Sequence, residues 1–308
     1  NGGSLTTHNG PGLVRFNAAG SNIGALNVQT AHLVQLGVSD AFVSSASLQV
    51  GGASNTSGDQ ARGTFDLNGF NQTFNSFNGD GVPAEPTSLR VVTNSAATLS
   101  VLTIGSGSSG GTFNGIIDGN IALVKNGTGV QTNRGPNRYT GGTTVNGGTL
   151  VLSNAVSHGS LTVNGGTFLF SPSLTVNGTL SGNGGTVDTV AAGNVLTVNQ
   201  STNSTFAGVL SNAGSLVKTG PGTLTLTGGN TYSGGTTVSQ GALCFGKTAS
   251  KPSSGAVTVA AGAGLGLGLG GTGGFSSSDV DTLWADALSG VTLDASSPRT
   301  GQIGRAHV

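Results

Sequence analysis

Short runs in which apolar and polar residues alternate recur along most of the chain. Residues 224–227 (Leu-Thr-Leu-Thr) alternate strictly, and residues 149–152 and 166–170 follow a more apolar version of the pattern. A period of two residues is typical of β-strands with one buried face, and these runs are too short for helices. The pattern predicts many short strands with Leu, Val and Phe pointing inward and Thr pointing outward.

Glycine pairs and Asn-Gly steps separate these runs, and 57 of the 308 residues are Gly. Such steps supply the positive φ angles that tight connections need. A Thr-Val pair, often followed by Asn-Gly, begins at Thr144, Thr162, Thr175, Thr197, Thr237 and Thr258. Several of these spacings are roughly twenty residues, the size of a solenoid repeat. We therefore predict stacked strands with ladders of Thr and Asn on successive turns.

A longer repeat contains this short one. Residues 125–150 reappear as residues 218–243, at a constant offset of 93 from Lys125 to Lys218, and about half of the positions are identical. Both copies contain an aromatic-x-Gly-Gly-Thr-Thr-Val segment, at residues 139–145 and 232–238. We assign the two clear repeat units to residues 118–152 and 211–245.

One segment departs from the strand pattern. Residues 276–290 place Val280, Leu283, Trp284, Ala287 and Leu288 at the spacing of one helix face. The preceding serines suit an N-cap, Asp279 and Asp281 suit the first turn, and Gly290 suits the position after the helix. We predict a short amphipathic helix at about 277–289, packed on the solenoid, with a partner-binding helix as the alternative.

Composition and charge exclude several classes of protein. Only 7% of residues are charged, with 11 Lys+Arg against 11 Asp+Glu and a pI near 7.1. The sequence therefore predicts no nucleic-acid partner and no basic surface for an anionic membrane. It contains no apolar run long enough to cross a bilayer. The single Cys244 cannot form an internal disulfide.

The ends of the chain lead to two further expectations. There is no Met and no signal peptide at residue 1, so we interpret the chain as an internal fragment of a longer protein. Residues 303–308 (Ile-Gly-Arg-Ala-His-Val) do not continue the Gly, Thr, Ser and Asn composition before them. We interpret them as a non-native tail and predict a solenoid over residues 1–302.

Residues 216–238 closely resemble the autotransporter-associated β-strand repeat, and residues 123–152 are similar. The first copy departs from the pattern at residues 131–134, where Gln-Thr-Asn-Arg replaces Leu-Thr-Leu-Thr, which weakens one strand. The resemblance implies an all-β fold, a right-handed parallel β-helix (β-solenoid) in a passenger region outside a Gram-negative-type cell. It also implies that a missing region of the parent chain anchors it to the outer membrane.

Family members of this kind are mostly adhesins or structural stalks. We therefore expect a non-enzymatic passenger or stalk fragment at the cell surface, with surface glycans or host or matrix proteins as its partners. A structural surface-layer or matrix protein would differ only in its partner. We predict no catalytic residue, no cofactor-binding residue and no metal ligand.

A carbohydrate-binding or carbohydrate-cleaving β-helix is the alternative. Cleavage needs converging carboxylates, but the single Glu, Glu85, lies between two prolines. The Asp residues before the predicted helix are scattered singly, at Asp40, Asp59, Asp66, Asp80, Asp118 and Asp188. Adjacent turns could still stack distant carboxylates, so the sequence leaves this alternative open.

Several motif matches suggest nucleotide or nucleophile chemistry. Residues 241–248, ending in Lys247-Thr248, fit the phosphate-loop pattern, but their middle aligns with the strand at 149–152. Residues 105–110 and 268–273 fit G-x-G-x-x-G, and residues 107–111 fit G-x-S-x-G. None opens a helix, and abundant glycine produces such matches by chance. We interpret all of them as strands and connecting loops.

Metal and ligand candidates are equally weak. Residues 184–188 resemble a calcium-binding repeat but have Val187 where Gly is needed. His8, His32 and His158 lack zinc-like spacing, and Cys244 aligns with a strand residue. Arg134 and Arg138 beside Tyr139 suggest either an acidic-sugar site or a solvated connection, and we favour the second interpretation.

Overall fold

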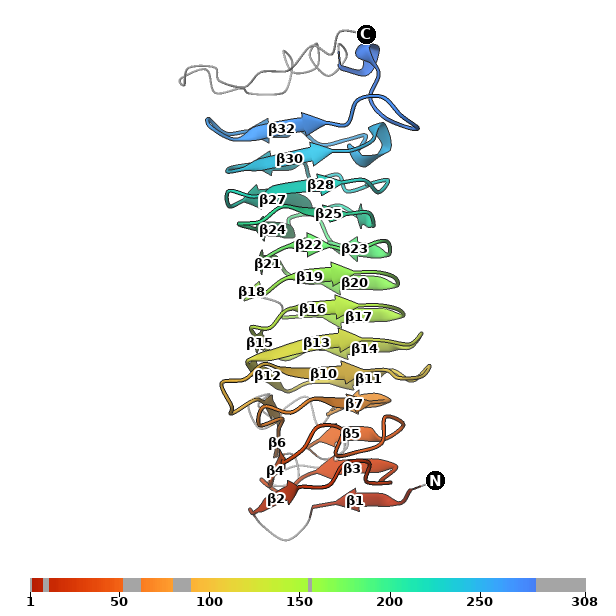
Figure 1. The fold of residues 1–308 in the computed structure, drawn as a ribbon, viewed down its shortest axis with the longest axis vertical. Helices are drawn as coiled ribbons and strands as arrows, with labels where there is room; N and C mark the ends of the chain where they lie inside the picture. Colours follow the sequence, from red (N-terminus) through yellow and green to blue (C-terminus); the bar gives the residue numbers. More distant parts are fainter. Residues whose placement is uncertain (1, 8–10, 52–61, 80–89, 155–156, 281–308) are drawn as a thin grey trace.

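The computed structural model describes residues 2–7, 11–51, 62–79, 90–154 and 157–280. Its strands lie across the long axis of the molecule and stack along it, forming a parallel β-solenoid of about 12 turns (Figure 1). Every strand pairing is parallel, and the chain passes over three faces in each complete turn. The predicted all-β solenoid is confirmed.

Among the described residues, the first face contains ten strands. Its first sheet comprises β7 (Gln72–Phe74), β10 (Ser100–Ile104), β13 (Ile121–Lys125), β16 (Thr143–Val145), β19 (Leu161–Val163) and β22 (Leu180–Ser181). A bridge from Gly182 to Phe206 continues it into β25 (Ser204–Phe206), β28 (Thr223–Leu226), β30 (Ala242–Phe245) and β32 (Gly264–Leu267).

The second face also contains ten strands within the described ranges. It begins with β1 (Ser4–Thr6), β3 (Ala25–Val28), β5 (Ser47–Val50) and β8 (Ser76–Asn78). A bridge from Gly79 to Phe113 leads into β11 (Gly111–Phe113), β14 (Val130–Asn133), β17 (Thr149–Leu152), β20 (Thr167–Phe170), β23 (Thr186–Asp188) and β26 (Val209–Ser211).

The third face is built from two six-stranded sheets. The first comprises β2 (Leu13–Phe16), β4 (Leu33–Leu36), β6 (Gly63–Asp66), β9 (Arg90–Thr93), β12 (Ile116–Gly119) and β15 (Asn137–Tyr139). The second comprises β18 (Ser157–His158), β21 (Leu174–Asn177), β24 (Val195–Asn199), β27 (Ser215–Thr219), β29 (Thr236–Val238) and β31 (Val257–Val259).

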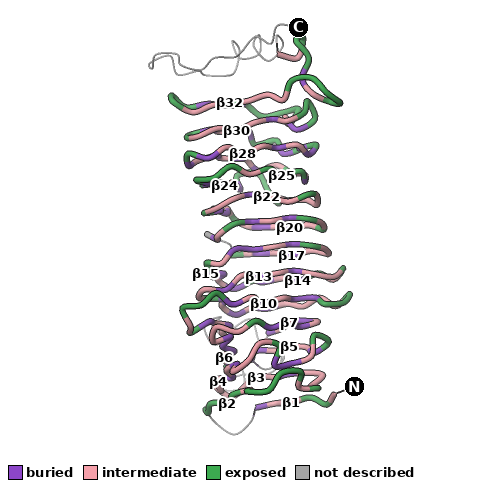
Figure 2. Tube along the Cα trace, viewed as in Figure 1, coloured by how far each residue is buried: buried purple, intermediate pink, exposed green. Residues whose placement is uncertain are grey.

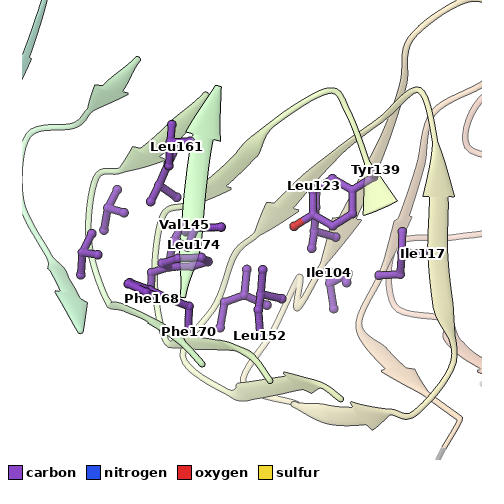
Figure 3. Close-up of a cluster of buried hydrophobic side chains, with 14 of the residues drawn as sticks. Ile104, Ile117, Leu123, Tyr139, Val145, Leu152, Leu161, Phe168, Phe170 and Leu174 are labelled. Atoms are coloured by element: carbon purple, nitrogen blue, oxygen red, sulfur yellow. The ribbon is translucent and has the colours of Figure 1, made fainter. Parts of the chain in front are cut away.

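The core lies inside the coil, where the inward residues of all three faces meet. Figure 2 shows buried segments alternating with more exposed ones along the strands. Figure 3 shows side chains from all three faces converging, among them Leu123, Leu152, Phe168 and Leu174. Each such buried side chain contributes about 1.5–3 kcal/mol, and the parallel register stacks like residues on successive turns.

In the first repeat copy, a strand forms even though residues 131–134 depart from the repeat pattern. In β14, Gln131 and Asn133 point into the core at the positions that Leu224 and Leu226 occupy in the second copy. The Nε2 atom of Gln131 donates to Phe77 O and to Asn133 Oδ1, each at 3.0 Å. Gln131 Oε1 and Asn133 Nδ2 find no hydrogen-bond partner among the described residues, so this strand carries a polar penalty.

The predicted C-terminal helix begins where expected. Residues 277–280 are helical. Ser276 Oγ accepts from the Asp279 main-chain N at 3.2 Å, and Asp279 Oδ2 accepts from the Ser276 main-chain N at 2.8 Å. This reciprocal pair is a capping box. The remainder of the predicted helix, with Asp281 and Trp284, lies outside the described residues.

Other predictions also fall outside them. Glu85, His8, Asp59, Asp80 and residues 303–308 are not described, so the boundary at residue 302 stays a prediction. A short 3-10 helix, η3 (Thr248–Ser250), follows β30. Within the described ranges, no helix combines the length and apolar character required to cross a bilayer.

Candidate functional site

Each of the two repeat copies has a buried lysine at the equivalent position. Lys125 in β13 and Lys218 in β27 are each 0% exposed. Lys218 Nζ donates to Thr219 O at 2.6 Å, to Gly220 O at 2.8 Å and to Gln240 O at 3.3 Å. Lys125 Nζ donates to the equivalent carbonyls, Asn126 O, Gly127 O at 3.3 Å and Gly147 O at 3.5 Å.

Each lysine therefore joins two successive turns of the solenoid. The first two carbonyls belong to its own turn, and the third belongs to the next. Burial lowers the pKa of both Lys125 and Lys218, because a charged ammonium loses water there. The carbonyl dipoles replace part of that water, so each lysine has the structural role of linking two successive turns.

A buried tyrosine is the second shared element. The hydroxyl of Tyr139 lies 2.7 Å from Thr143 Oγ1, and that of Tyr232 lies 2.5 Å from Thr236 Oγ1. Burial raises the pKa of Tyr139 and raises that of Tyr232 to about 12, although the threonine hydrogen bond opposes the shift. Both phenols are therefore neutral packing groups.

The glycines shared by the two copies lie where the backbone conformation or a close contact disfavours any larger residue. Gly142 and Gly235 have φ angles of 93° and 91°, a region that favours glycine. At Gly129 and Gly222, an added Cβ would lie 2.3 Å from Ser109 O and 2.4 Å from Thr202 O. The repeat thus specifies close approach between neighbouring turns.

The two copies begin on different faces. The first starts on the first face with β13, whereas the second starts on the third face with β27. The hydrogen bonds of the shared lysine and tyrosine are nevertheless equivalent in the two copies, so these contacts do not depend on the face on which the copy starts. The residues it repeats point inward or shape the corners, and they do not build one recurring binding surface.

Sequence reasoning missed the inward lysines, although a signal was present. In Ile121–Lys125 the alternation that buries Ile121 and Leu123 continues to Lys125, and the same phase buries Lys218 after Leu216. A charged residue in the inward phase of both copies indicates a structural role.

His158 lies at the junction between the two sheets of the third face. It is 4% exposed, and its ring centroid lies 4.6 Å from that of Tyr139. Neither ring nitrogen makes a hydrogen bond of ordinary geometry. Burial lowers the pKa of His158 to about 4, and the main chain of Tyr139 opposes only part of that shift. His158 is therefore a neutral core residue.

The glycine-rich motif matches fall on strands and loops. Residues 242–245 of the phosphate-loop match form β30, and Lys247 is exposed before η3. Residues 105–110 lie in the connection between β10 and β11, and the overlapping G-x-S-x-G match at residues 107–111 ends on the first residue of β11. Residues 268–273 follow β32. Among the described residues, none of these segments leads directly into a helix longer than η3 that could receive a phosphate.

The described carboxylates each occupy a separate structural position. Asp66 accepts from Gln35 Nε2 at 2.9 Å, from Ser95 Oγ at 2.6 Å and from the main chain of Asn68 at 2.9 Å. Burial alone would raise the pKa of Asp66, but these hydrogen bonds outweigh it and hold the pKa below its usual value. Asp188 accepts from Val190 N at 2.7 Å.

No hydrogen bond joins two carboxylates in the described part of the chain, and no three His, Cys, Asp or Glu side chains gather there as metal ligands would. Asp188, from the calcium-like segment, also accepts from Asn212 Nδ2 at 2.8 Å. His32 contacts Gln29 O at 3.1 Å. Cys244 is a half-buried free thiol in β30, and burial raises its pKa.

The proposed basic cluster does not form one surface. Arg134 and Arg138 are exposed, whereas Tyr139 is fully buried. Arg138 points outward from β15, beside Asp118 of β12 in the parallel register. An acidic-sugar site using all three side chains is therefore not present.

The outer surface carries the predicted ladders. On the first face, Thr144 pairs with Thr162, whose Oγ1 lies 3.1 Å from Ser181 Oγ. At the next corner, Asn146 Nδ2 donates to Asn126 Oδ1 at 2.8 Å, and Asn164 Nδ2 donates to Asn146 Oδ1 at 2.9 Å. These ladders leave an outer surface that is polar but nearly uncharged.

Comparison with known proteins agrees with this anatomy. Residues 123–152 and 216–243 match the passenger-associated-transport-repeat family. These matches include Lys125 and Lys218, Tyr139 and Tyr232, and the strands that surround them.

One curated relative is the Adhesin BmaC autotransporter of Brucella suis biovar 1 (strain 1330), which is 35% identical over 133 residues. That alignment covers 38% of this chain and 4% of the relative, so the chain spans a small part of the protein it resembles. No solved structure matches the chain. The chain therefore carries two passenger-associated transport repeats in a parallel solenoid and is in this respect similar to an autotransporter passenger.

Proposed function

We propose that this chain is a non-enzymatic stretch of a surface-exposed passenger that presents an adhesive surface to glycans or to host or matrix proteins. The observation that carries the proposal is the separation of roles in the repeat. Its shared residues, such as Lys218, Tyr232 and Gly222, hold the coil together. Most outward positions differ between the copies, as Arg134 and Thr227 do. A scaffold of this kind suits presentation of binding residues.

Two further observations support adhesion at the cell surface. The relative is itself described as an adhesin autotransporter, and the continuous solenoid extends the chain along one axis, as a stalk would (Figure 1).

The test attaches the purified 308-residue chain to fluorescent beads and counts beads retained on host cells and on immobilised matrix proteins. Albumin-coated beads are the control. We expect retention above that control, with no release of reducing ends from polysaccharides incubated with the chain. Retention equal to albumin would contradict adhesion, and release of reducing ends would contradict the non-enzymatic assignment.

A further inference from the structure

The first face is irregular near the N-terminal end of the solenoid. Before β7, the loops at residues 17–24 and 37–46 take the place of strands. They leave a surface groove of about 460 Å³, lined by residues that include Asp40, Val43, Ser44 and Thr73. The groove is shallow and largely open to solvent, unlike the clefts that bury most of a drug-sized ligand.

The walls of this groove are fixed by hydrogen bonds. Gly20 N donates to Asp40 O at 2.7 Å, Ser21 N donates to Ala41 O at 2.8 Å, and Asp40 N donates to Asn71 O at 2.8 Å. Ser21 and Phe42 also form an isolated parallel bridge. The two loops therefore continue the stacking of the solenoid without regular strands.

A buried side-chain amide completes this arrangement. Gln72 is 1% exposed. Its Oε1 accepts from Phe42 N at 3.1 Å, and its Nε2 donates to Phe42 O at 3.0 Å. The carboxamide thus pairs with Phe42 as a peptide group of a neighbouring strand would, which fixes the floor of the groove before any ligand arrives.

Asp40 lies at the rim in an uncommon backbone conformation. Its φ angle is 50°, in the left-handed region that non-glycine residues enter at an energetic cost. Its main-chain N and O are both hydrogen-bonded, and its side chain is exposed. The structure therefore places an unburied carboxylate beside the groove, on a backbone that hydrogen bonds hold in position.

The groove chemistry fits an uncharged sugar. A carboxylate accepts hydrogen bonds from neighbouring hydroxyls, the Ser44 and Thr73 hydroxyls can donate or accept, and Val43 offers an apolar patch. No cationic side chain lines the groove among the described residues, and Asp40 would repel an acidic sugar. We propose that this groove binds a neutral hexose or N-acetylhexosamine residue through Asp40, an inference that rests on the proposed adhesive function and names its ligand class.

The test uses saturation-transfer NMR on the whole chain with methyl glycosides of glucose, galactose, mannose and N-acetylglucosamine. The variants are Asp40→Asn, which removes the charge with a residue that tolerates the left-handed region, and Ser44→Tyr, which fills the groove. Asp118→Asn is the matched control, because Asp118 is an exposed aspartate on the regular third face. Circular dichroism checks that each variant keeps its strand content.

We expect one or more glycosides to bind the unaltered chain and the Asp118→Asn variant equally. Binding should weaken at least fivefold in both groove variants. Absence of transfer to every glycoside, equal binding by the Asp40→Asn variant, or tighter binding of an alkylamine probe than of any glycoside would overturn the proposal.

The bead assay separates this inference from the proposed function. If Asp40→Asn beads adhere as well as unaltered beads, adhesion stands and the groove is not its site. If unaltered beads fail to adhere but a glycoside still binds through Asp40, the groove stands and the adhesive function is wrong.

Discussion

Replacing His158 should remove a defined part of the acid sensitivity of this solenoid. The pKa of His158 is about 4 in the folded chain against 6.5 for a free side chain. Above pH 6.5 both states are neutral and the stability is complete. As the pH falls from 6.5 toward 4, the unfolded chain takes up a proton that the folded chain rejects. At about 1.4 kcal/mol for each pH unit, the free energy of unfolding should fall by about 3 kcal/mol.

Urea unfolding followed by circular dichroism, at several pH values across this window, measures the effect. The His158→Leu variant has a side chain of similar size and no titrating group, so its free energy of unfolding should lose about 3 kcal/mol less across the window. His32→Gln is the matched control for losing a histidine. Protonation of Asp66, whose pKa lies below its usual 3.8, acts below this window. Parallel pH profiles for the unaltered chain and His158→Leu would refute the reasoning.

Four further substitutions test the repeat. Lys125→Met and Lys218→Met should each lower the free energy of unfolding by about 1–3 kcal/mol, because the main-chain carbonyls around each ammonium lose their hydrogen-bond donor. Urea midpoints that do not move would contradict the role of these lysines in linking successive turns. Gln131→Leu should raise the urea midpoint by the equivalent of about 1 kcal/mol, because it removes an unsatisfied buried oxygen and restores the residue of the second copy; a lower midpoint would show that the two hydrogen bonds of Gln131 matter more. Gly222→Ala should cost about 1–3 kcal/mol through its contact with Thr202 O, and a thermal melt like that of the unaltered chain would contradict the close approach.

The sequence was sufficient to predict the strands and their stacking. The alternation at residues 224–227 became β28, and the aligned residues 149–152 became β17. These predictions succeeded because a period of two and glycine-rich corners are local signals.

The candidate groove could not be predicted in this way. Asp40 and Thr73 belong to different turns, and the loops between them have no period that fixes their separation. The pairing of the Gln72 carboxamide with the main chain of Phe42 could not be predicted either. The carboxamide takes this role because no regular strand lies beside β7 on that side. The face on which each repeat copy starts could not be predicted either. It depends on the number of residues in every connection that precedes the copy.

The direction of the hydrogen bonds has a mechanical consequence. Parallel strands here lie across the long axis, so their hydrogen bonds point along it (Figure 1). A force applied to the two ends therefore breaks the hydrogen bonds of one turn at a time. The coil should lengthen in small steps at modest force. Lys125 and Lys218 each bridge one turn to the next, so their positions are where such an extension should pause.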